Sequence, residues 1–129
     1  MLPSIAIDEP DGGLSESIRS LRQFGQLRTL RLAHEPAVAR APLARQLDLL
    51  RAVSACASLR IAQLVNIGLG DAWGYALADV LPRMDSLRVL DVSHNYIGSD
   101  ATRAIAAALP ANHSLLWLQL LPQWLQWVL

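Results

Sequence analysis

Two consecutive stretches of the chain share one length and one pattern of apolar residues. The first begins at Leu59 and the second at Leu87, so the repeat length is 28 residues (87 − 59 = 28). Residues that recur in register include Leu64 and Val92, Gly70 and Gly98, Leu77 and Ile105, Leu81 and Leu109, Pro82 and Pro110, and Ser86 and Ser114. Self-similarity at a fixed period predicts a stack of similar structural units, and this constrains the fold more than any other feature.

Each unit contains two periodicities. A short alternating stretch such as 87–92 predicts a strand, and the following stretch, with Ala101, Ile105 and Leu109 at four-residue steps, predicts a helix. Neither element can bury its apolar face alone. Stacked units are therefore expected to place the strands side by side in a parallel sheet, with the helices on one side of it.

The spacing L-x-x-L-x-L predicts units that start near 2, 27, 59, 87 and 115. The unit at 27 is 32 residues long (59 − 27 = 32), and we assign the extra residues to an insertion around Pro36 and Pro42. We interpret residues 1–129 as a single domain of about four to five units. Because the C-terminal stretch is apolar rather than polar, we expect a short array or a fragment of a longer one.

The unit that begins at Leu87 resembles a leucine-rich repeat of the ribonuclease-inhibitor type over its full length, and the resemblance covers most of the chain. It implies an α/β horseshoe solenoid, with parallel strands on the concave face and helices on the convex face. In that family an Asn after the strand ties neighbouring turns together, and Asn95 occupies its place. The resemblance also implies protein recognition, with GTPase-activating and inhibitor-type enzyme regulators among the relatives.

Two positions depart from the family pattern. At the place of Asn95 the preceding units carry Ile67 and Glu35. Trp73 stands where the next unit has Ala101 and where the family keeps a small residue. We therefore expect irregular packing around Trp73.

The alternation of a strand assigns the concave face. If the first, fourth and sixth residues of each unit are buried, the third, fifth and seventh face outward. The outward set is Thr29, Arg31, Ala33, Ile61, Gln63, Val65, Val89, Asp91, Ser93, Trp117, Gln119 and Leu121. Arg and Trp are enriched among the residues that dominate protein interfaces, so Arg31 and Trp117 are the strongest individual candidates.

The second position of three successive units is arginine: Arg28, Arg60 and Arg88. Strands lie about 4.8 Å apart, so these residues form a row of like charge that favours a partner with an acidic face. The alternative is that they are solvated loop residues paired with nearby acids. The predicted binding residues are Arg28, Arg31, Arg60, Gln63, Arg88, Asp91 and Trp117. The formal net charge is zero, and we expect a protein partner and no nucleic acid.

We expect no catalysis, metal or cofactor. His34 and His94 share a position in their units, but a whole strand separates them, which places them roughly twice 4.8 Å apart. Cys56 is the single cysteine and is interpreted as a packing residue. The segment from Gly68 to Gly74 lacks the G-x-G-x-x-G spacing, and the chain has no lysine for a P-loop.

The expected function is a non-catalytic protein-protein interaction module that binds through the concave sheet. The alternative is a regulator of an enzyme. A third hypothesis is a membrane-surface anchor in the Trp-rich C-terminus, which lacks a basic face and is interrupted by Pro122. The apolar C-terminal end gives a reason to expect self-association. The N-terminus lacks the regions of a secretory signal, and we expect a cytoplasmic location.

Overall fold

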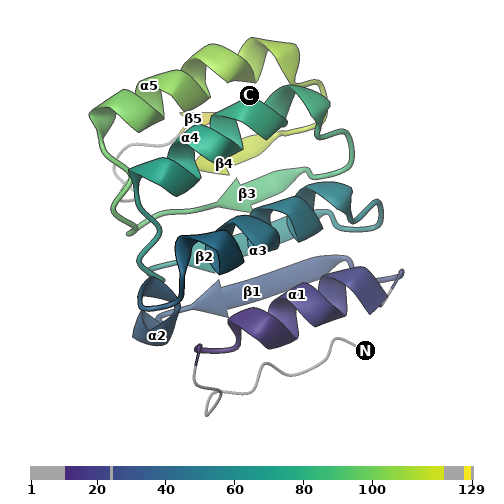
Figure 1. Ribbon diagram of the computed structural model, residues 1–129. Coiled ribbons are helices and arrows are strands. Elements are labelled where there is room, and N and C mark those ends of the chain that lie inside the picture. The colour runs from purple at the N-terminus through teal and green to yellow at the C-terminus, as the bar shows by residue number, and fades with distance from the viewer. Residues whose placement is uncertain (1–10, 24, 121–126, 129) are drawn as a thin grey trace.

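Strands alternate with helices along the chain in the computed structural model, which describes residues 11–23, 25–120 and 127–128 (Figure 1). The strands are β1 (Thr29–Ala33), β2 (Ile61–Val65), β3 (Val89–Asp91), β4 (Trp117–Gln119) and β5 (Trp127–Val128). The helices are α1 (Leu14–Gln23), α2 (Pro36–Ala39), α3 (Leu43–Ala55), α4 (Asp71–Val80) and α5 (Ser99–Ala108), with 3₁₀ turns η1 (Leu81–Arg83) and η2 (Leu109–Ala111). The α/β class predicted from the sequence is therefore correct.

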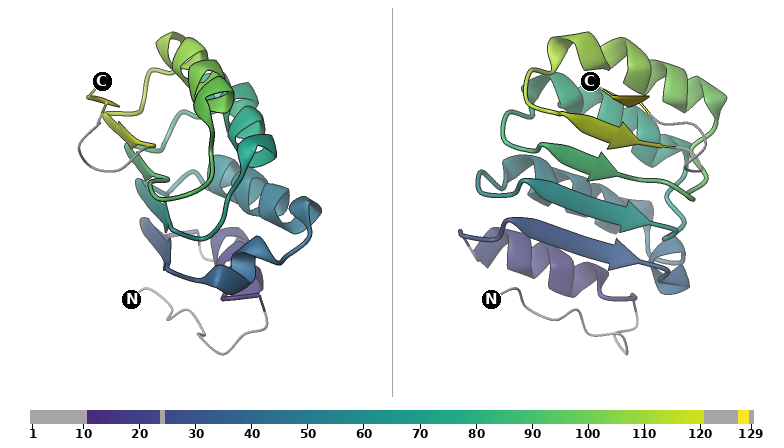
Figure 2. Two further views of the ribbon diagram at one scale, coloured as in Figure 1. Left: turned by 90° about the vertical axis from the view of Figure 1, so that its left-hand side faces the viewer. Right: turned by 180° about the vertical axis from the view of Figure 1, so that it is seen from behind.

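The strands form one sheet in the order β1-β2-β3-β4-β5, and the first four are parallel. Helices α1, α3, α4 and α5 lie side by side on one face of the sheet, so the molecule has two layers (Figure 2). Parallel neighbours require a crossover connection, which α3, α4 and α5 supply. Within the described residues, no helix covers the opposite face of the sheet.

The residues that pair between neighbouring strands are separated in sequence by the repeat length. Ile61 pairs with Val89, a separation of 28 residues, and β3 keeps the same separation from β4. Thr29 pairs with Ile61, a separation of 32 (61 − 29 = 32). The longer connection contains α2, and the loop after β2 passes directly over it. Gly68 has φ +82°, and a Cβ at this position would lie 2.2 Å from Ala39 Cβ, so only glycine fits there.

The core lies between the sheet and the helix layer. The first, fourth and sixth residues of the units starting at 27, 59, 87 and 115 are all buried, which confirms that part of the sequence prediction. They are Leu27, Leu30, Leu32, Leu59, Ala62, Leu64, Leu87, Leu90, Val92, Leu115, Leu118 and Leu120. The helices add Leu49, Trp73, Leu77 and Ile105 to the same cluster. Burial of apolar side chains from both layers therefore drives the fold.

The horseshoe leucine-rich-repeat solenoid expected from the sequence is wrong. The structure is a small α/β domain whose four parallel strands are followed by β5, which runs antiparallel to β4. Seven residues separate Gln119 from Trp127 (127 − 119 − 1 = 7), too few for the crossover that another parallel strand needs. β5 also occupies the edge of β4 where the next unit would pair. The strand expected to begin near Leu2 lies outside the described residues, whereas the helix of that unit is α1.

Candidate functional site

One face of the parallel sheet carries no helix of the described residues. Parallel sheets are usually covered on both faces, so an open face is an unusual feature of this architecture. Side chains that point to it are half-buried or exposed in every strand from β1 to β4. We define the outward sheet face by these residues: Thr29, Arg31, Ala33, Ile61, Gln63, Val65, Val89, Asp91, Trp117 and Gln119.

The strand register arranges this face in rows that cross the sheet. One row is largely apolar and consists of Thr29, Ile61, Val89 and Trp117. The next row is polar and consists of Arg31, Gln63, Asp91 and Gln119. Neighbouring strands lie about 4.8 Å apart, so each row spans roughly 15 Å. The face therefore offers an apolar strip beside a strip of hydrogen-bonding groups.

The three arginines at the strand starts are in register but differ in their contacts. The backbone N–H of Arg60 donates to the carbonyl of Arg28 at 2.8 Å, and the N–H of Arg88 donates to the carbonyl of Arg60 at 2.8 Å. Arg60 Nη1 also donates to the Ser86 carbonyl at 3.3 Å, and Arg88 Nη1 donates to the Ser114 carbonyl at 3.4 Å. Two of the three guanidinium groups therefore join one connecting loop to the next.

Arg31 and Asp91 lie in the same row but do not meet, because Gln63 of β2 stands between them. Asp91 Oδ1 accepts a hydrogen bond from the backbone N–H of Ser93 at 3.0 Å, in the turn after β3. Ser93 itself, expected on the open face, is buried. Arg31 is exposed, and no ion pair of Arg31 is found within the described residues. Its charge is therefore available to a partner.

Asn95 holds two neighbouring turns together. Its Oδ1 accepts hydrogen bonds from the backbone N–H groups of Ile67 at 3.0 Å and Leu69 at 3.1 Å. Its Nδ2 donates to the carbonyls of Leu64 at 2.8 Å and Val92 at 2.9 Å. All four partners are main-chain groups at the carboxyl ends of β2 and β3, which gives Asn95 a structural contact set rather than a ligand-facing one.

A feature that the sequence reasoning missed lies directly after the strands. His34, Asn66 and His94 have φ values of 58°, 54° and 59°, the left-handed region that few residues other than glycine adopt. Asn66 Nδ2 and His34 Nδ1 are 3.0 Å apart, so the two side chains share a hydrogen bond. The sequence signal was the shared position of the two histidines, which asparagine occupies in the unit between them. These residues form the turns, and Asn and His tolerate that conformation better than most.

Neither a metal centre nor a membrane-crossing helix is found in the part of the chain that the structure describes. No three His, Cys, Asp or Glu side chains there gather closely enough to hold a metal ion. No helix among those residues combines the length and apolarity needed to cross a bilayer. Cys56 is buried, and its Sγ lies 3.5 Å from Ser58 Oγ.

Comparison with known proteins gives a likeness in structure alone. No family model matches the sequence, and no curated protein matches it. A structure of the tropomodulin C-terminal domain from Caenorhabditis elegans aligns with a TM-score of 0.67 at 18% identity, covering 84% of this chain and 62% of that one. A structure described as leiomodin-1 actin-binding site 2 aligns with a TM-score of 0.69 at 20% identity, covering 93% of this chain and 64% of that one.

These neighbours correct the family assignment made from the sequence. The fold is that of the tropomodulin and leiomodin domains, and the identification as a ribonuclease-inhibitor-type leucine-rich repeat is wrong. The enzyme-regulator alternative came only from that resemblance and is withdrawn with it. The chain spans less than two thirds of the length of either neighbour, 62% and 64%. At 18% and 20% identity, the likeness describes the fold and not the activity.

Proposed function

We propose that this chain is a non-catalytic protein-binding domain that binds its partner through the outward sheet face. The observation that supports this most directly is that no helix of the described residues covers this face of the parallel sheet, a surface that such sheets usually bury. It combines an apolar row with a polar row, and protein interfaces likewise combine a buried apolar centre with polar surroundings. Trp117 and Arg31 belong to the residue types that dominate binding energy at interfaces.

Actin is the partner we propose to test first. One structural neighbour is described as an actin-binding site, and the same architecture presents the open sheet face in this chain. We further propose that the partner surface is acidic where it meets the strand starts of β1 to β3, because Arg28 and Arg88 are exposed there. A cytoplasmic location remains part of this proposal. The membrane-anchor and self-association hypotheses depend mainly on C-terminal residues outside the described part of the chain.

The first test compares binding of the native chain and two variants to actin filaments by co-sedimentation and to actin monomers by fluorescence anisotropy. Ile61→Asp with Val89→Asp places two charges at the centre of the apolar row. Arg28→Glu with Arg31→Glu reverses charge at two exposed positions whose guanidinium groups make no hydrogen bond within the described residues. Either variant is expected to weaken binding at least tenfold, since about 1.4 kcal/mol corresponds to a factor of ten.

A matched control reverses charge on the opposite face. Arg19→Glu with Arg103→Glu changes the net charge by the same amount, on α1 and α5. This control is expected to retain binding, and circular dichroism checks that each variant folds. Raising the salt concentration should weaken the native complex, because the Debye length falls to about 3 Å at 1 M. Binding that survives both outward-face variants would remove this face as the site, and a native chain that binds neither form of actin would remove actin as the partner.

A further inference from the structure

The helix layer is packed unevenly on the two sides of α4. Toward α5 the helices approach closely because residue 74 is glycine: a Cβ there would lie 2.9 Å from Ile97 Cγ2 and 3.1 Å from Ala101 Cβ. Toward α3 stands Trp73, which is fully buried, and its Nε1 donates to the Gln46 carbonyl of α3 at 3.0 Å. The indole occupies the place that Ala101 occupies one unit later. A bulky ring in this position holds α3 and α4 apart.

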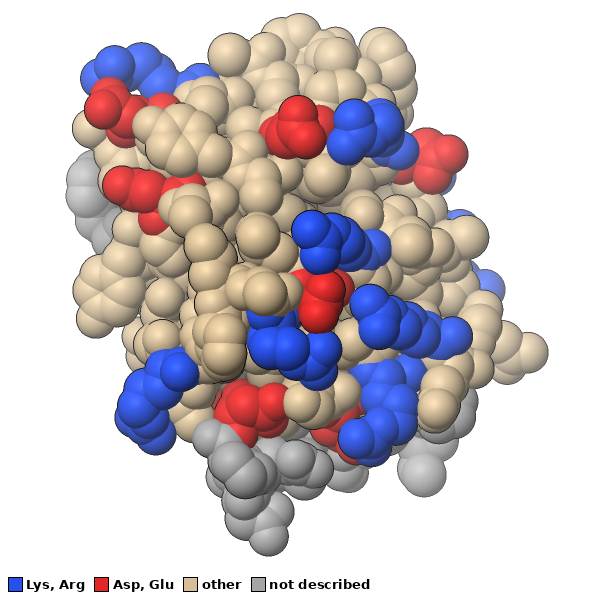
Figure 3. Space-filling model, in the orientation of Figure 1, with Lys and Arg blue, Asp and Glu red and all other residues tan. Residues whose placement is uncertain are grey.

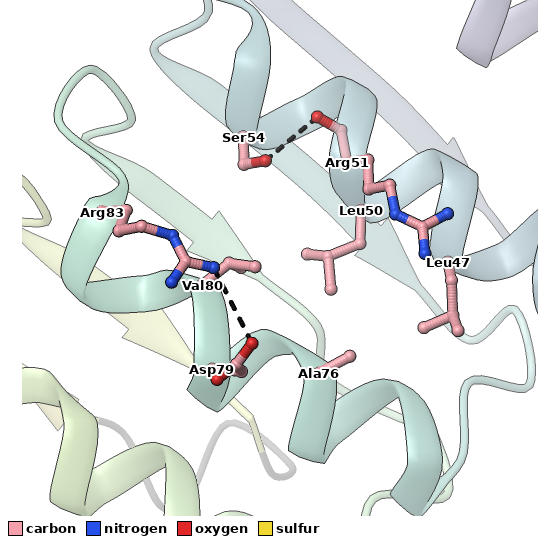
Figure 4. Close-up of a pocket in the computed structure, with 8 residues that line it drawn as sticks. All are labelled: Leu47, Leu50, Arg51, Ser54, Ala76, Asp79, Val80 and Arg83. Carbon is pink, nitrogen blue, oxygen red and sulfur yellow. Dashed lines mark hydrogen bonds and ion pairs between the residues drawn. The ribbon is translucent and has the colours of Figure 1, made fainter.

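A groove lies where the two helices are held apart. It has a volume of about 400 Å³ and is lined by Leu47, Leu50, Arg51 and Ser54 of α3, by Ala76, Asp79 and Val80 of α4, and by Arg83 of η1. Figure 4 shows the side chains of Leu47, Leu50, Ala76 and Val80 around the space between the helices. We call this feature the α3–α4 groove. Its floor is apolar, and its rim is charged.

Positive charge predominates around the groove. The side chains of Arg51 and Arg83 are 67% and 68% exposed. The Asp48 carboxylate pairs with both Arg51, at 3.0 Å, and Arg45, at 2.9 Å. Arg83 Nη2 lies 3.7 Å from Asp79 Oδ2.

A neighbouring hollow beside α1 is lined by Arg22 and again by Arg51. Figure 3 shows arginine side chains gathered over the lower half of this face, where α1 and α3 lie. Three arginines therefore line the groove and the hollow, Arg22, Arg51 and Arg83, against one lining carboxylate, Asp79.

We propose that the α3–α4 groove binds an acidic amphipathic helix of a partner protein. An amphipathic helix fits such a groove by placing residues of one face, spaced three and four apart, on an apolar floor. Leu47, Leu50, Ala76 and Val80 supply that floor. Carboxylates that flank the apolar stripe would meet Arg51 and Arg83, since guanidinium groups pair well with carboxylates. This interaction surface lies on the opposite layer from the outward sheet face and is independent of the function proposed above.

The test uses a synthetic fluorescein-labelled helix of about 14 residues, close in length to α3. It carries leucine along one stripe and glutamate on the flanks, and a second peptide replaces each glutamate with lysine. The glutamate peptide is expected to bind the native chain saturably in fluorescence anisotropy and the lysine peptide is not. Arg51→Glu with Arg83→Glu is expected to weaken binding about tenfold or more. Ala76→Trp, which fills the groove without changing charge, is expected to abolish binding.

Two matched controls separate groove binding from general attraction. Arg19→Glu with Arg103→Glu reverses two exposed arginines that also pair with a carboxylate on their own helix, at 2.6 Å and 3.2 Å. Ala104→Trp places the same ring one unit later (104 − 76 = 28), on α5. Both controls should bind the peptide as the native chain does. The proposal is overturned if the glutamate peptide shows no saturable binding, or if Ala76→Trp binds as well as Ala104→Trp. The outward-face variants should leave peptide binding unchanged, so either site can fail without the other.

Discussion

The junction of α4 with α5 and the junction of α4 with α3 are built by opposite means. On the α5 side, Gly74 lets two helices approach, and Asn95 ties together the turns that precede them. On the α3 side, Trp73 fills the interface, and Ile67 occupies the position that corresponds to Asn95 (95 − 67 = 28). Trp73 and Gly74 are adjacent in sequence but have opposite effects on helix spacing. Trp73 separates α4 from α3, whereas Gly74 lets α4 approach α5. Similar units can therefore stack with unlike interfaces, and the looser interface leaves a groove.

The largest expected effect is the loss of the indole. Trp73→Ala should lower the free energy of unfolding by about 3–5 kcal/mol, because a fully buried ring leaves a cavity and its hydrogen bond to the Gln46 carbonyl is lost. Urea denaturation followed by circular dichroism measures this change. Tyr75→Ala on the same helix, where the side chain is 49% exposed, is the control and should change stability by less than about 0.5 kcal/mol. A loss below about 1 kcal/mol for Trp73→Ala would mean that α3 and α4 close over the space.

The next largest effect is expected at Asn95, whose side chain connects the turns that follow β2 and β3. Asn95→Ala should cost about 2–3 kcal/mol, because it removes the partners of several main-chain groups at once. At the other junction, Asn66→Gly removes only an exposed hydrogen bond and keeps a left-handed conformation that glycine favours, so a change within about 0.5 kcal/mol is expected. Chemical denaturation of both variants gives the comparison. Equal losses would show that the two junctions depend on their asparagines to the same degree.

The sequence predicted the features that follow from periodicity. Leu59, Leu87 and their repeat partners were predicted to be buried because an apolar residue recurs at the same position of each unit, and the structure buries them. The alternation along each strand predicted the residues of the outward sheet face, except Ser93, which is buried in the turn after β3, and Leu121, which lies outside the described residues.

Other features depend on geometry that one-dimensional patterns do not contain. The reach of Arg60 to the Ser86 carbonyl depends on how two loops stack. The antiparallel return of β5 was missed because the leucine spacing at 115 predicts a strand but does not specify the direction of the next one. The groove was missed for a similar reason: Trp73 signalled irregular packing, but its effect on helix spacing depends on the three-dimensional contact with α3.

A smaller effect tests the close approach on the α5 side. Alanine in place of glycine inside a helix gains about 1 kcal/mol from propensity alone, whereas overpacking costs about 1–3 kcal/mol. Gly74→Ala should therefore lower stability by roughly 1 kcal/mol, because its Cβ would meet Ile97 and Ala101. A double-mutant cycle with Ile97→Ala provides the control, since removing the Ile97 methyl groups should make Gly74→Ala less costly. Independent, additive effects would contradict a tight interface at this position.

The smallest expected effect is a gain on the α3 side. Ala76→Leu places three more carbons on the floor of the α3–α4 groove beside Leu50 and Val80, and it should raise the free energy of unfolding by about 0.5–1 kcal/mol. Ala104→Leu, the equivalent change on α5, should have an effect near zero, because no helix packs against the far side of α5 within the described residues. Thermal and urea denaturation of both variants distinguish the two positions. A gain at 76 without a gain at 104 would mean that the α3–α4 groove contains apolar surface that the domain itself does not cover. A partner helix needs such a surface to bind there. A loss at 76 would mean that α3 and α4 already fill the space between them, and the contrast between the two sides of α4 would then reduce to the single contact at Gly74.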